Sequence, residues 1–148
     1  MDAYPFALIV HIFAAVMFVG TVFFEVLILE GVRKKVSPRF MEALEGAIGR
    51  QARKIMPFVM LFLFGSGITM VWLRYQEFFL HPLTYSFGLL LDIKITLAVV
   101  VLCHFLTAMF LISTGRMKSI YFKRIHLSVF VHVVLIVLLA KAMFFWTW

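Results

Sequence analysis

One apolar stretch, residues 88–112, limits what this chain can fold into more than any other part of the sequence. It has more than twenty residues, and a helix of that length, rising ~1.5 Å per residue, crosses a hydrocarbon core of ~30 Å. The stretch nevertheless contains Asp92, Lys94 and His104. An ionisable side chain inside a membrane span costs roughly 2.5–3.5 kcal/mol on insertion scales, so such residues usually face a bundle interior and mark a functional site. We therefore expect the chemistry of this chain near Lys94 and His104.

The composition indicates an integral membrane protein. Of the 148 residues, 64% are hydrophobic and only 14% are charged, and a water-soluble domain of this length could not bury so much apolar surface. The formal net charge of +7 lies between apolar spans, where topology rules place it, so it does not indicate nucleic-acid binding. The single cysteine, Cys103, excludes an internal disulfide.

Four apolar spans are predicted, at about residues 5–29, 55–73, 88–112 and 125–145. We predict an all-α fold, a four-helix up-and-down bundle that forms a single transmembrane domain over residues 1–148. No basic segment precedes the first span, so we expect a retained helix and not a cleaved signal peptide.

The connections between the spans predict the orientation. Lys and Arg accumulate on the cytoplasmic side, and they are concentrated in residues 30–54 and 113–124 but nearly absent from residues 74–87. Both basic connections are therefore predicted inside and both termini outside. Ser37-Pro38 opens a cytoplasmic amphipathic segment between the first two helices, most simply an interfacial extension of the second span.

Depth sorts the polar residues of the spans into two layers. Counted from the outer ends, His11 and Lys94 lie roughly 9 Å deep and Lys141 roughly 8 Å deep. His104 and His132 both lie roughly 20–25 Å deep. Two layers of histidine in a four-helix bundle resemble the plan of membrane b-type cytochromes, so His11, His104 and His132 are candidate metal ligands.

Helical angles limit which of these side chains share one interior. Lys94 and His104 differ by roughly 80°, so both can face inward. His132 and Lys141 differ by roughly 180°, so one of them must face lipid, a neighbouring subunit or a groove between helices. Lys141 is also close enough to the membrane surface to snorkel.

Other polar and sulfur-containing residues allow further interpretations. Met56 and Met60 are spaced to hold Cu(I) together with His11 and Cys103, although methionine also serves as core filling in apolar chains. Near the inner boundary, His126 is assigned to the charges of the neighbouring connection.

Four local motifs resemble the HemJ-type protoporphyrinogen IX oxidases and the related CopD-like membrane domains, over nearly the whole chain. The motifs are LIVHIFAAVMFVG with His11 and Gly20, GRQARKIMPFVMLFLFGSG with Arg53, Pro57 and Gly65 or Gly67, LLLDIKITLAVVVLCHF with Lys94 and His104, and VVLIVLLAKAMFF with Lys141. The resemblance implies a four-helix membrane oxidoreductase that binds b-type haem, oxidises protoporphyrinogen and passes electrons onward to quinone.

We accordingly predict a membrane haem protein that exchanges electrons with a porphyrinogen or a quinone. His11 is predicted as an axial ligand of one outer haem b. Lys94 and Lys141 lie beside it as candidate catalytic residues, able to pair with propionates, to bind an anionic substrate or to transfer protons. A second, inner haem on His104 and His132 ranks below this one. The alternative function is CopD-like copper transport or binding.

The same considerations predict the surroundings of the chain. We expect a multi-pass protein of a bacterial inner (cytoplasmic) membrane. Its partners are membrane lipid and a quinone or porphyrin-type small molecule, and not nucleic acid. A homo-oligomer is compatible with the sequence.

Overall fold

The computed structural model describes residues 2–81, 83 and 85–146, which form helices joined by short turns with no strand among them. Residues 1, 82, 84, 147 and 148 of the predicted domain lie outside these described residues. The elements in chain order are α1 (Tyr4–Phe23), η1 (Phe24–Leu29), α2 (Glu30–Arg33), α3 (Pro38–Met70), η2 (Val71–Tyr75), α4 (Gln76–Leu80), α5 (Ser86–Ser113) and α6 (Ser119–Phe145). The segments η1 and η2 are turns of π-helix.

Four continuous helical segments are long and apolar enough to cross a membrane. They are Tyr4–Arg33, Pro38–Phe78, Ser86–Ser113 and Ile120–Phe145. The predicted all-α class and the four long apolar helices are therefore confirmed.

The second of these segments is much longer than the predicted span, because the amphipathic stretch is its first part. Ser37 caps the helix: its Oγ accepts a hydrogen bond from the Phe40 N–H at 3.4 Å. Pro38 occupies the first turn, where its missing N–H costs nothing. From there α3 continues through Pro57 to Met70 without interruption.

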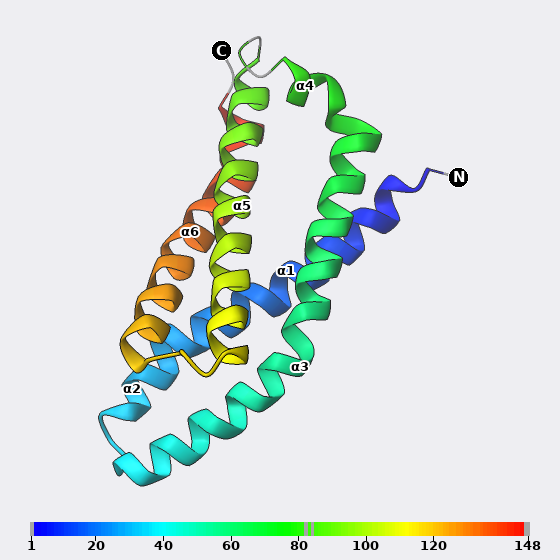
Figure 1. Ribbon diagram of the computed structural model, residues 1–148. Helices are drawn as coiled ribbons and strands as arrows, with labels where there is room; N and C mark the ends of the chain where they lie inside the picture. The colour runs from blue at the N-terminus through cyan, green and yellow to red at the C-terminus, as the bar shows by residue number, and fades with distance from the viewer. Residues whose placement is uncertain (1, 82, 84, 147–148) are drawn as a thin grey trace.

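Successive helices run in alternating directions, with α5 and α6 side by side and α1 crossing the bundle obliquely (Figure 1). The largest packing contacts join α1 to α3 and α5 to α6. The α2–α3 and α5–α6 turns lie together at the lower end of Figure 1, and the start of α1 and the end of α6 lie in its upper half. This arrangement is the predicted up-and-down order; which end faces the cytoplasm stays a prediction.

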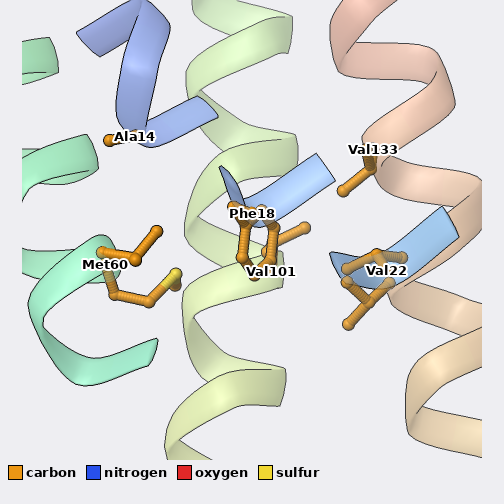
Figure 2. Packing of buried hydrophobic residues seen from close by; sticks show 8 residues of the cluster. Ala14, Phe18, Val22, Met60, Val101 and Val133 are labelled. Atoms are coloured by element: carbon orange, nitrogen blue, oxygen red, sulfur yellow. The ribbon is translucent and has the colours of Figure 1, made fainter. Parts of the chain in front are cut away.

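All four long helices contribute to one apolar core. Its buried members are Ala14, Phe18, Val22, Val59, Met60, Val101, Val129 and Val133. Figure 2 shows the Phe18 ring in the middle of this cluster, with Met60 on one side and Val133 on the other. Because lipid tails are as apolar as these side chains, close packing and not water exclusion holds such helices together.

The turn between α5 and α6 depends on Gly115, whose φ of +66° is costly for any residue with a Cβ atom. The Gly115 N–H donates to Ile112 O at 3.1 Å and the Arg116 N–H donates to Leu111 O at 2.8 Å. These two bonds form the Schellman motif that ends many helices. The motif returns the chain after only a few residues, which places α6 directly against α5.

Candidate functional site

Two histidines face each other across the α5–α6 contact. The ring centroids of His104 and His132 lie 5.8 Å apart, with the ring planes inclined by 45°. Both side chains are half-buried. The sequence predicts the two residues at the same depth in neighbouring spans, and the structure places them side by side.

The backbone fixes the tautomer of both rings. His104 Nδ1 lies 2.8 Å from the Val100 carbonyl oxygen, and His132 Nδ1 lies 2.7 Å from that of Ser128. A carbonyl oxygen only accepts, so each Nδ1 carries the proton and donates it. The Nε2 lone pair of each ring is thereby left for a metal, the arrangement that metal-binding histidines commonly show.

His11 lies between α1 and α3 and not beside another histidine. Its Nδ1–H is shared between Leu63 O at 3.0 Å and Ser66 Oγ at 3.2 Å. A Cβ atom added to Gly67 would lie 3.2 Å from His11 Cε1. The glycine therefore admits the imidazole against the α3 backbone.

The two lysines predicted beside His11 differ in their surroundings. Lys94 is half-buried on α5. Lys141 is exposed on α6, whereas His132 lies against α5. The prediction that a straight helix turns only one of His132 and Lys141 inward is consistent with this placement.

A cavity of about 500 Å³ lies at the end of the bundle that contains the α2–α3 and α5–α6 turns. We call it the inner cavity. Part of its wall is the apolar core, contributed by Phe18, Val22, Val101 and Val129. The remaining wall carries seven ionisable residues: Glu25, Arg33, Glu42, Glu45, Arg53, Lys118 and His126. His104 and His132 do not line it, but Val101 and Val129 each lie three residues before one of them.

The most enclosed polar contact of this cavity joins Glu25 to His126. Glu25 Oε2 lies 2.6 Å from His126 Nε2, and the side chains are 10% and 24% exposed. His126 Nδ1 donates to Phe122 O at 2.9 Å, so a second proton must lie between Nε2 and Oε2. The pair therefore holds a proton in a half-enclosed cavity, whichever partner carries it.

This pair was not predicted as a site from the sequence. From the sequence, His126 is attributed to the charges of the neighbouring connection. Glu25 lies in η1, where the π-helical turn rotates side chains relative to an ideal α-helix. One signal was present: His11, Phe18 and Glu25 are spaced by seven residues and so share a stripe.

Three further ion pairs hold the α2 end of the cavity. Glu30 contacts Arg33 at 2.9 Å and Lys123 at 3.2 Å, and Arg33 also pairs with Glu45 of α3. They join α2 to α3 and α6, and the charge of Arg33 is thereby balanced.

Within the described residues, no group of three or more His, Cys, Asp or Glu side chains is placed to hold a metal ion. Of the residues considered for copper, Cys103 is exposed and Met60 is buried in the core. Comparison with protein-family models, with curated proteins and with solved structures finds no match to this chain. The resemblance to the HemJ-type and CopD-like families thus rests on the four motifs and stays a prediction.

Proposed function

We propose that this chain is a membrane b-type haem protein that exchanges electrons with a porphyrinogen or a quinone. The observation that carries the proposal is the pair of His104 and His132. Two imidazoles from neighbouring helices, each with Nδ1 committed to a backbone carbonyl, offer two free Nε2 atoms. This donor set fits the chemistry of iron in a b-type haem, which imidazole nitrogens ligate.

The residues around the pair have definite tasks in this proposal. The Val100 and Ser128 carbonyls orient the two rings, and the apolar helices keep water away from them. A haem bound there would supply one-electron transfer, with its potential set by the ligands and the dry surroundings.

His11 offers a second candidate position, which the motif resemblance favours. Its Nδ1 is also committed to a carbonyl, and Lys94, half-buried on α5, would be a partner for a carboxylate of a cofactor or substrate. Lys141, which is exposed, would serve an anionic group that reaches the protein from outside the bundle. We rank this outer position second, because its histidine has no histidine beside it.

The location proposed for the protein is the bacterial inner membrane, with both termini outside. The four apolar helices support a multi-pass membrane protein. The concentration of Lys and Arg at the α2–α3 and α5–α6 turns supports a cytoplasmic position for that end.

An absorbance spectrum of the purified protein, before and after reduction with dithionite, tests the haem. We expect the bands of a b-type haem, and a colourless preparation from haem-replete cells would refute the proposal. His104→Ala and His132→Ala should each lower the haem-to-protein ratio, whereas the exposed control His81→Ala should not. If only His11→Ala lowers it, the iron belongs to the outer position. Stoichiometric copper without haem would instead favour the copper-binding alternative.

A further inference from the structure

The inner cavity has the size and lining of a small-molecule site. Its volume of about 500 Å³ falls within the ~300–1,000 Å³ typical of ligand pockets. Core residues of α1, α5 and α6, including Phe18, Val101 and Val129, provide an apolar wall. Such pockets usually combine apolar walls with a few polar groups that orient the ligand.

The Glu25–His126 pair also lines the inner cavity and is its least exposed polar contact. His126 Nε2 engages Oε2 of the carboxylate, which leaves the lone pairs of Oε1 to accept from another donor. Glu25 lies on the π-helical turn η1, and such turns are frequently found at functional sites. The imidazole is held by Phe122 O and lies against the Phe122 ring, with centroids 4.0 Å apart.

The charges of the cavity restrict the chemistry of a ligand. An anionic group placed at Glu25 would lie beside a carboxylate, which is unfavourable in a poorly solvated site. Arg33 is engaged by Glu30 and Glu45, and Arg53 and Lys118 are exposed toward solvent, as is Glu42. A neutral hydrogen-bond donor on an apolar body fits both the apolar wall and the Glu25 carboxylate.

We infer that the inner cavity binds an apolar molecule with a hydroxyl headgroup of the phenol or hydroquinone class, and that this hydroxyl donates to the Glu25 carboxylate. The inference rests on the proposed redox function for the use of the ligand, since a hydroquinone is a carrier of electrons and protons. Its binding, however, is a separate property that can be measured without haem.

Equilibrium dialysis of the full-length protein in lipid nanodiscs, under argon, tests the inference. The probe is n-decylhydroquinone, and the control ligand is its dimethyl ether, which has the same apolar body but no donor. We expect the hydroquinone to bind at least about tenfold more tightly than the ether, the lower end of what a hydrogen bond to a charged group contributes.

Two variants locate the site. Glu25→Gln should reduce the affinity for the hydroquinone toward that of the ether, whereas Glu42→Gln, the same change at an exposed carboxylate of the same cavity, should leave both unchanged. Gly49→Leu should weaken both ligands by occupying the cavity. A Cβ atom there meets only the far end of the Arg53 side chain, Nη1, at 3.8 Å, which is ordinary van der Waals contact.

Equal binding of the two ligands to the unmodified protein would overturn the inference, as would an equal effect of Glu25→Gln and Glu42→Gln. If Glu25→Gln does not fold, the Gly49→Leu variant tests the site instead. Undiminished hydroquinone binding by Gly49→Leu would place the ligand outside the inner cavity. If the purified protein is colourless but binds the hydroquinone, the proposed haem function is refuted and the proposed binding site in the inner cavity stands. If the protein contains haem but does not bind the hydroquinone, the haem function stands and the binding site is refuted.

Discussion

The His11 imidazole lies against Gly67 of α3, so close that a Cβ atom at Gly67 would come within 3.2 Å of His11 Cε1. The ring also donates to the Leu63 carbonyl of the same helix. Together these contacts set the separation of α1 and α3 at this depth, and a Cβ atom at position 67 requires the His11 ring to shift by a few tenths of an ångström.

Substitution of the two glycines that flank Ser66 should therefore have opposite effects. Gly65→Ala meets nothing within 4 Å and should stabilise the helix by up to ~1 kcal/mol. Gly67→Ala should lose that gain and cost ~1 kcal/mol or more through overpacking against His11. Thermal unfolding in detergent measures both. Equal melting temperatures for the two variants would contradict the described packing.

The α5–α6 turn should be sensitive to any residue with a Cβ atom at position 115. Gly115→Ala forces a left-handed backbone conformation on alanine and should cost ~1–2 kcal/mol. Gly31→Ala, at a helical glycine with open space around it, is the matched control and should be neutral or stabilising. The free energies of unfolding in detergent should separate the two, and a neutral Gly115→Ala would show that the turn can rearrange.

The two carboxylate pairs near the inner cavity should differ in strength. Lys123→Leu removes an exposed partner of Glu30 and should cost less than about 1 kcal/mol. His126→Leu leaves Glu25, which is only 10% exposed, without its partner, and should cost roughly 1–3 kcal/mol. The double variant Glu25→Leu/His126→Leu should recover part of that loss. Purely additive effects in this double-mutant cycle would indicate that the contact contributes nothing.

The predicted orientation can be tested with single cysteines introduced in a Cys103→Ser background. An impermeant maleimide applied to intact cells should label Asp2→Cys, and should label Thr114→Cys only after the membrane is opened. The reverse pattern would invert the bundle, and would place the inner cavity on the outer face.

The helices could be predicted from the sequence because apolar runs long enough to cross a bilayer are a strong signal. Their ends could not be predicted with the same method. Hydropathy marks where a helix would leave the hydrocarbon, whereas the cap at Ser37 and the proline after it mark where the α3 backbone becomes helical. That is why α3 begins at Pro38, where the sequence predicts the amphipathic extension to open, although its apolar span was predicted only from residue 55.

The candidate site was predictable to the extent that ideal helix geometry holds. Depth counting placed His104 and His132 at one level, and α5 and α6 are regular helices over that region. The same counting does not apply to Glu25, because the π-helical turn η1 holds an extra residue and rotates the side chains around it relative to an ideal α-helix. Its contact with His126 also joins residues 101 positions apart, which no local pattern reveals.

The length of the second helical segment has a mechanical consequence. Its main helix, α3, has 33 residues, about 50 Å at ~1.5 Å per residue, which exceeds the ~30 Å of a hydrocarbon core. In a bilayer, we therefore expect the first part of α3, which carries Arg39, Arg50 and Arg53, to lie outside the hydrocarbon core, at the level of the lipid headgroups. Because this part is continuous with the rest of α3 through Pro57, attraction of its arginines to anionic headgroups would constrain the tilt of the whole bundle in the bilayer.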